Sequence, residues 1–237
     1  MSVEHRGLRL QASVSARERR LAGLLEKRGL ASDAPALRAI VEAAQLLGSL
    51  ELAGLRPSWE EVREAGAGAP ESVRSLRRAR EAVDPREPLT VDAIRRWHGA
   101  LLGAVGFRRT VREREEAPPP APPDLVGSRL DLLEAWLATP SARDLRPEQS
   151  AAVTLARIVE VLPFEDGNGR VSRLAASHVM VQGGGRAPIL VAGDAPRLVA
   201  SLQAAFRLET GPLSALLSEA SSRALDVMIQ SLERGEA

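Results

Sequence analysis

The sequence predicts a mainly α-helical protein, on three observations. Apolar residues recur at intervals of three and four over most of the 237 residues. Several of these stretches follow residues that cap helices. No long alternation of apolar and polar residues, the signature of a half-buried strand, is present. The hydrophobic content of 44% is enough to build a core.

Four helices are expected before residue 86. Two of them begin with a capping box, in which a serine and the glutamate three residues later bond to each other's backbone amides. The expected helices follow Ser15, Pro35 and Ser58, and a fourth, carrying Val73, Leu76 and Val83, runs up to Pro85.

The remainder of the chain also reads as helices joined by loops. Proline cannot continue a helix interior and disfavours helical dihedrals in the preceding residue, so residues 117–123 should be extended and one helix should end before Pro163. Helices are expected after Thr90, over Leu130 to Leu137, from Pro147, from the motif described below to the glycines at 183–185, and over about 195–208 and 212–234.

Composition excludes several classes of function. A net charge of +1 gives no general attraction to nucleic acid or an anionic membrane. Without cysteine there are no disulfides and no thiol chemistry, and three scattered histidines do not indicate a metal site. There is neither an eighteen-residue apolar run nor an apolar signal segment, so we expect a cytoplasmic protein.

The most informative stretch is residues 162–173, Leu-Pro-Phe-Glu-Asp-Gly-Asn-Gly-Arg-Val-Ser-Arg. Its glycines allow a tight turn, and the amides that follow belong to the first turn of a helix, where the helix dipole favours phosphate. Arg170 and Arg173 share one helix face and can each bind phosphate oxygens. Asp166 is a candidate Mg²⁺ ligand, since Mg²⁺ usually binds through one or two carboxylates and substrate phosphates. The alternative to a phosphate site is an ordinary turn before a capped helix, with arginines that are only solvated.

This stretch resembles the signature of the Fic (Fido) family, His-Pro-Phe-x-Asp-Gly-Asn-Gly-Arg-x-x-Arg. Leu162 stands where the family has its catalytic histidine. Other segments are similar as well. Gly106 to Arg108 and Pro118 to Pro123 resemble the borders of the family's β-hairpin flap, and Ser49 to Gly54 resembles the Ser-x-x-x-Glu-Gly motif of an inhibitory helix.

The resemblance implies a Fic-type helical bundle with a short or degenerate β-hairpin flap. We divide the chain into an N-terminal helical region at 1–85, with a degenerate inhibitory-type helix at about 35–54, a Fic-like core at 86–225, and a C-terminal helix end or tail at 226–237. Family members transfer AMP, or occasionally another phosphate-containing group, from a nucleotide to a protein hydroxyl.

The resemblance also assigns residues to tasks. Asp166 would bind Mg²⁺, and Arg173 would reach the far end of the triphosphate of ATP or another nucleotide. The phosphate would be held by Gly167, Asn168, Gly169 and Arg170. The expected partners are the nucleotide and a protein target or partner that the sequence does not identify. A homodimer is possible, and the sequence leaves the oligomeric state open.

Three departures limit the transfer of activity. Leu162 cannot take a proton, and general-base catalysis typically contributes ~10²–10⁴-fold. Ala53 occupies the inhibitory glutamate's position, beside Ser49 and Gly54, and the span from Arg109 to Pro118 is short for a full flap. The leading interpretation is a nucleotide-binding pseudoenzyme. The alternatives are a transferase of altered chemistry, an interaction scaffold, and an active enzyme silenced by an engineered Leu162.

Overall fold

The computed structural model describes residues 3–31, 34–64, 66, 68–103, 106–114 and 118–236, with the side chains of residues 3–13 left undescribed. Every regular element in these ranges is helical, which confirms the predicted fold class. Besides the short 3₁₀ turns Pro123–Leu125 and Ala192–Asp194, the helices are α1 Val3–Arg28, α2 Pro35–Glu51, α3 Trp59–Glu64, α4 Glu71–Glu81, α5 Val91–Leu102, α6 Val126–Leu137, α7 Pro140–Arg143, α8 Pro147–Val161, α9 Asn168–Gln182, α10 Ala195–Ala205 and α11 Gly211–Arg234.

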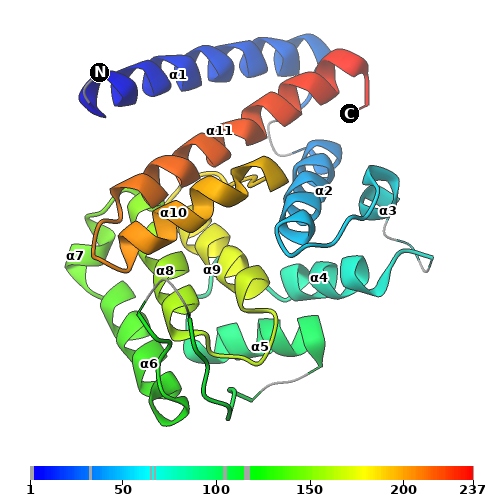
Figure 1. Ribbon diagram of the computed structural model, residues 1–237. Helices are drawn as coiled ribbons and strands as arrows, with labels where there is room; N and C mark the ends of the chain where they lie inside the picture. Colours follow the sequence, from blue (N-terminus) through cyan, green and yellow to red (C-terminus); the bar gives the residue numbers. More distant parts are fainter. Residues whose placement is uncertain are drawn as a thin grey trace.

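The centre of the molecule is the pair formed by α8 and α9, which pack more extensively on each other than any other two helices (Figure 1). Both helices contribute small or branched apolar side chains to the main core, among them Ala151, Ala152, Ile158, Val171 and Ala175. Small side chains allow two helices to approach closely. The loop between these helices carries the motif, so the core fixes both of its ends.

Helix α2 lies beside the motif end of α9 and is fitted closely to the chain. A Cβ built on Gly48 would lie 1.7 Å from the backbone carbonyl oxygen of Leu190, so only glycine permits this approach. Gln45, one turn earlier, donates from its amide to the carbonyl oxygen of Ala187 at 3.0 Å. The position of α2 next to the motif therefore depends on backbone contact as well as on apolar packing.

Most predicted boundaries are confirmed. The capping box at Ser58 and Glu61 has both hydrogen bonds, Ser58 N to a Glu61 carboxylate oxygen at 2.7 Å and Glu61 N to Ser58 Oγ at 3.1 Å. Thr90 caps α5 by accepting from Ala93 N at 3.1 Å. The box predicted at Ser15 does not start a helix, since α1 already begins at Val3. Likewise, Pro123 opens a 3₁₀ turn rather than continuing the extended segment.

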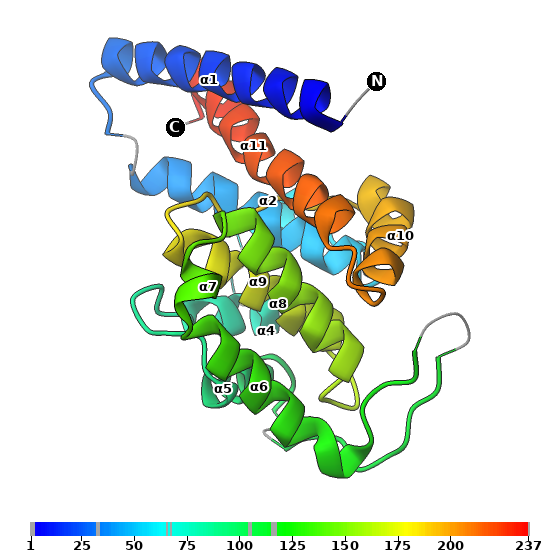
Figure 2. The same cartoon turned by 90° about the vertical axis from the view of Figure 1, so that its left-hand side faces the viewer.

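The segment between α5 and α6 corrects the prediction of a β-hairpin flap. Its described residues, 106–114 and 118–122, contain no strand, and residues 115–117 lie outside the described part of the chain. Figure 2 shows this segment extending from the bundle as a long loop. With Pro118, Pro119, Pro120 and Pro122 on its returning arm, the loop lacks the backbone donors that a ladder needs.

No helix in the described ranges is long and apolar enough to cross a lipid bilayer. The predicted limits of the N-terminal region and the core are not tested by the fold, but α11 continues through residue 225 to Arg234 without interruption.

Candidate functional site

The site begins where α8 ends. Leu162 donates its amide to the Ile158 carbonyl oxygen at 3.0 Å and takes a left-handed conformation, with φ 48° and ψ 65°. This conformation closes a helix well, but it is uncommon for a branched apolar residue. Pro163 then prevents the helix from continuing. Leu162, the position at which the resemblance predicts a missing base, is therefore also the helix cap.

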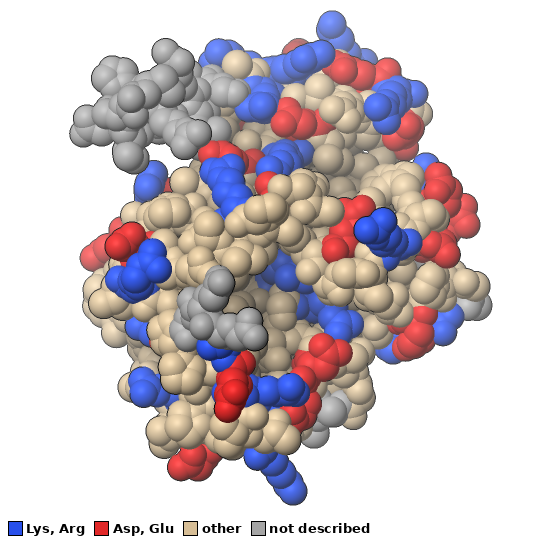
Figure 3. Space-filling view, viewed as in Figure 1, with Lys and Arg blue, Asp and Glu red and all other residues tan. Residues whose placement is uncertain are grey.

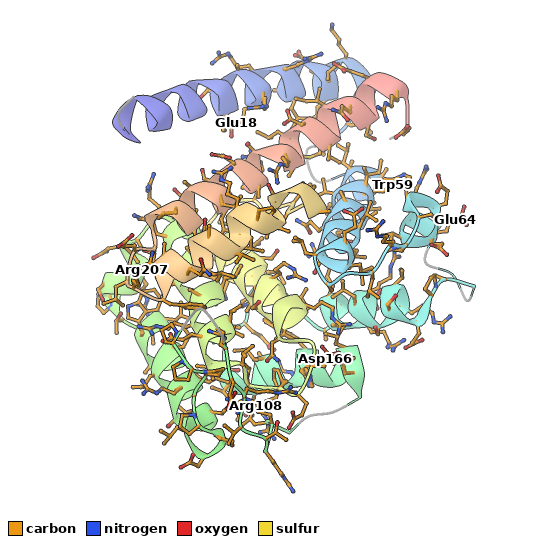
Figure 4. All side chains as sticks on the ribbon, viewed as in Figure 1. Glu18, Trp59, Glu64, Arg108, Asp166 and Arg207 are labelled. Carbon is orange, nitrogen blue, oxygen red and sulfur yellow. The ribbon has the colours of Figure 1, made fainter. Side chains whose placement is uncertain are left out.

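Arg108 holds this end of α8 from 54 residues upstream. Its side chain is 2% exposed, and burial lowers the pKa of its guanidinium. The backbone amide of Arg108 also donates to the carbonyl oxygen of Pro163 at 2.9 Å. Figure 4 shows Arg108 between the long loop and the central helices. The guanidinium donates to backbone carbonyl oxygens of Val161, Leu162, Thr110 and Ala121.

Glu165 fastens the long loop to the motif. Its carboxylate accepts from the Thr110 hydroxyl at 2.7 Å, from the Arg112 guanidinium at 2.9 Å, and from the backbone amides of Arg109 and Thr110 at 3.2 and 3.3 Å. The hydrogen bond from Thr110 is the main cause that lowers the pKa of Glu165. A carboxylate with a lowered pKa is a weak proton acceptor at neutral pH.

The turn of the motif rests on His98 of α5. The imidazole stacks on the Phe164 ring with centroids 3.7 Å apart, and its Nε2 lies 3.0 Å from the Asp166 carbonyl oxygen. A carbonyl only accepts, so His98 donates there. Gly167 has φ 78°, and a Cβ on it would lie 2.9 Å from a Leu102 methyl. The backbone therefore favours glycine at this position, and a larger residue would also displace the Leu102 side chain.

Asn168, the first residue of α9, closes the loop on itself. Its Oδ1 accepts from Phe164 N at 2.9 Å, and its Nδ2 donates to Phe164 O at 2.8 Å. Both polar ends of the amide thus bond within the protein. Its predicted contact with phosphate stays a prediction, and its observed task is to shape the turn.

Asp166 and Arg170 lie together at the mouth of the site. The Asp166 carboxylate accepts from Gly167 N at 2.6 Å and from Arg170 Nη2 at 3.2 Å, and its side chain is 78% exposed (Figure 4). Arg170 is only 11% exposed in its side chain. Within the described ranges no three acidic or histidine side chains converge as a metal site would require. A single carboxylate suits Mg²⁺ only when phosphates and water complete its coordination.

Arg173 joins α9 to α2. Its Nε donates to Ser49 Oγ at 3.0 Å and its Nη2 to the Ser49 carbonyl oxygen at 2.7 Å. Burial, with a smaller contribution from the charge of Arg170, lowers the pKa of Arg173 to about 10. No ion pair joins Arg173 to a carboxylate in the described part of the chain. Its third nitrogen, Nη1, faces Gly169, where a built Cβ would come within 3.1 Å of it.

The segment likened to an inhibitory helix reaches the same place. Ser49 is on α2 and contacts Arg173, and Ala53, just past the helix end, lines the adjoining cavity. Gly54 takes φ 80° in the turn that follows, and it does not line the cavity. The structure thus brings Ser49 and Ala53 to the motif and leaves Gly54 aside.

A cavity of about 890 Å³ adjoins the motif. Figure 3 shows this face, with Lys and Arg atoms recessed in a hollow near its centre. Leu162 is not part of the wall. Sequence reasoning also missed the contribution of α4, although its polar residues recur at helical spacing. The residues that line the cavity are Leu52, Ala53, Leu55, Glu71, Ser72, Ser75, Arg78, Leu101, Leu102, Gly103, Glu165, Asp166, Gly167, Asn168, Gly169, Arg170 and Arg173.

Part of the sequence is similar to known proteins. Residues 88–180 match the Fic/DOC family. The chain is 31% identical over 108 residues to the protein adenylyltransferase Fic of Nematostella vectensis, which covers 43% of this chain and 25% of that relative. The chain thus spans about a quarter of the length of that protein.

Solved structures share the fold. Residues 134–508 of Fic-1 from C. elegans superpose with a TM-score of 0.73 at 22% identity, over 95% of this chain and 74% of that one. A Fic-domain signaling protein from Bacteroides thetaiotaomicron gives 0.75 at 18% identity, over 94% and 98%. Residues 88–180, which contain the motif, therefore match the Fic/DOC family, and the helical bundle has the same fold as these two Fic structures.

Proposed function

We propose that this protein binds a nucleotide through its phosphates and lacks the base of a conventional adenylyltransferase. The observation that carries this proposal is Arg173, a half-buried guanidinium whose pKa is lowered to about 10, mainly by burial, and whose described partners are the neutral oxygens of Ser49. A buried charge is costly unless it is paired. An anion beside Nη1 would compensate it.

The start of α9 supports the same ligand. Its first amides have no carbonyl partner within the helix, and the helix dipole favours negative charge there. Arg170 lies on the same face as Arg173 and lines the same cavity. Asp166, exposed at the mouth, would hold Mg²⁺ together with the phosphates of ATP or another nucleotide. The cation would neutralise phosphate charge.

The absence of a base rests on the side chains near the motif. Leu162 cannot accept a proton, and the carboxylate of Glu165 is already occupied by residues 109–112. The two histidines whose side chains are described, His98 and His178, are each 3% exposed and do not line the cavity. We therefore favour a pseudoenzyme over a transferase of altered chemistry, which would need a nucleophile that is already ionised.

Calorimetric titration with AMP, ADP and ATP, with and without Mg²⁺, tests the phosphate site. Gly169→Ala should weaken binding by about tenfold or more, because the added methyl meets Arg173 Nη1, which Ser49 holds in place. Gly193→Ala is the matched control, since nothing lies within 4 Å of a Cβ there. If none of the nucleotides binds to the natural chain at millimolar concentration, the proposal is wrong and a scaffold remains.

Incubation with labelled ATP and a panel of candidate proteins tests the missing base. We expect no transfer of label by the natural chain or by Leu162→Asn, and transfer by Leu162→His if the remaining geometry is competent. Label transferred by the natural chain would overturn the pseudoenzyme and favour the altered chemistry.

A further inference from the structure

A second wall of the cavity comes from α4, which lies outside the motif. Glu71, Ser75 and Arg78 are spaced by four and three residues, so they share one helix face, and all three line the cavity. Ser72, one turn before Ser75, lines it too. This wall is polar and carries a third arginine in addition to Arg170 and Arg173.

The ion pair between Arg78 and Glu71 can break with little loss of stability. Its Nη2 donates to Glu71 Oε1 at 2.6 Å, while Arg74 holds the other carboxylate oxygen through Nε at 3.0 Å and Nη2 at 2.7 Å. These hydrogen bonds lower the pKa of Glu71. Arg78 is 52% exposed in its side chain, and exposed pairs contribute little to stability. When Arg78 turns away, Glu71 keeps Arg74 as its partner.

The charges around the cavity favour a polyanion. Each of its three carboxylates is already paired with an arginine: Glu71 with Arg74 and Arg78, Glu165 with Arg112, and Asp166 with Arg170. Neither Arg74 nor Arg112 belongs to the lining. A ligand with several negative charges therefore meets carboxylates that are already neutralised, together with Arg173, which has no carboxylate partner in the described part of the chain.

We propose that Arg78 binds the distal anionic group of the ligand, so that the cavity selects a nucleoside di- or triphosphate over a monophosphate. This inference rests on the proposed nucleotide site. The first phosphate occupies the start of α9 beside Arg170, and Arg173 contacts the phosphates beyond it. Arg78, on a long side chain from α4, exchanges Glu71 for the phosphate at the far end, which a monophosphate lacks.

The test compares AMP, ADP and ATP by calorimetry on the natural chain and on Arg78→Gln. One lost charge-assisted contact should weaken ATP by about tenfold and leave AMP within about twofold. The control is Arg96→Gln on α5, an arginine of similar exposure paired with Glu87 at 3.1 Å and outside the cavity. It should change neither ligand. Melting curves of both variants should stay within a few degrees of the natural chain.

A second variant reverses the effect. Glu71→Gln removes the carboxylate that competes for Arg78, so ATP should bind more tightly while AMP does not change. Equal losses for AMP and ATP in Arg78→Gln, or no loss for either, would overturn the inference while leaving the phosphate site intact. Failure of the natural chain to bind any of the three nucleotides would instead remove the proposed function, and this inference with it.

Discussion

Leu162 combines two properties that the sequence could not show together. Its side chain cannot accept a proton, which is visible in the sequence, and it occupies a left-handed backbone conformation, which is visible only in the structure. Histidine and asparagine adopt that conformation more readily than leucine does. The left-handed backbone at residue 162 thus suits histidine or asparagine better than the leucine that is present.

Substitutions at this position should follow backbone preference. Leu162→Ile should lower the free energy of unfolding by about 1–2 kcal/mol, because a β-branched residue fits poorly at positive φ. Leu162→Asn, which tolerates positive φ, should cost less despite its smaller apolar surface. Urea unfolding of the two variants measures the difference. A more stable Ile variant would contradict the backbone argument.

His178 gives the fold a dependence on pH. His178 is 3% exposed, and its ring lies edge to face with the Trp97 ring, with centroids 5.3 Å apart. Burial lowers the pKa of His178, although a backbone hydrogen bond with Glu87 and the charges of Asp84 and Glu87 act to raise it. The unfolded chain binds the proton at about pH 6.5, whereas the folded chain binds it only at lower pH. Its contribution to stability is complete above that pH.

Stability should therefore fall as the pH drops below about 6.5, in the window between the unfolded and folded pKa values of His178. Urea unfolding between pH 5 and 8 measures this trend. In His178→Leu, the free energy of unfolding should depend less steeply on pH, because this residue no longer takes up a proton. The dependence that remains is due to carboxylates. If both proteins give the same slope, protonation of His178 is not its cause.

At the scale of elements, the local sequence predicted where the helices lie but not the long-range contacts that hold them together. Apolar spacing, Thr90 and the Ser58 capping box located most helices, because these signals act within a few residues. The resemblance predicted a short or degenerate β-hairpin flap, whereas the described residues 106–114 and 118–122 contain no strand. Arg108, Glu165 and His98 hold the motif through contacts more than 50 residues apart in sequence, which no local pattern reports.

The close approach of α2 makes a sharp prediction. Gly48→Ala should destabilise the protein by about 3 kcal/mol or more, because the added methyl would overlap the Leu190 carbonyl and α2 would have to move. Gly23→Ala in α1 is the matched control, since nothing lies within 4 Å of that Cβ and alanine favours helix by about 1 kcal/mol. Thermal unfolding should show opposite shifts for the two variants.

At the scale of the whole molecule, the described residues form two apolar clusters of unequal size. The larger surrounds α8 and α9, and the smaller joins α1, α2 and α11 (Figure 1). The pairs Arg17 with Asp226 and Arg20 with Glu233 border the smaller one, but they are partly or fully exposed and add little. The smaller cluster consists of Leu21, Leu25, Leu37, Leu225, Ile229 and Leu232.

Helix α1 should consequently open at lower free energy than the centre of the bundle. Hydrogen exchange should be faster over residues 14–28 than in α8 and α9. Leu25→Ala should accelerate exchange in α1 alone, whereas Leu155→Ala, in the main core, should accelerate it throughout. Uniform exchange across α1, α8 and α9 would show that the two clusters unfold as one unit.

The anchors of the motif loop also bear on the order of folding. The hairpin of α8 and α9 needs only local chain closure, but His98, Arg108 and Thr110 must return from 54 to 68 residues away before the turn is fixed. Contacts across such separations form slowly because loop closure costs entropy. An isolated peptide of the two central helices would carry every letter of the signature and still lack the shape that the signature adopts here.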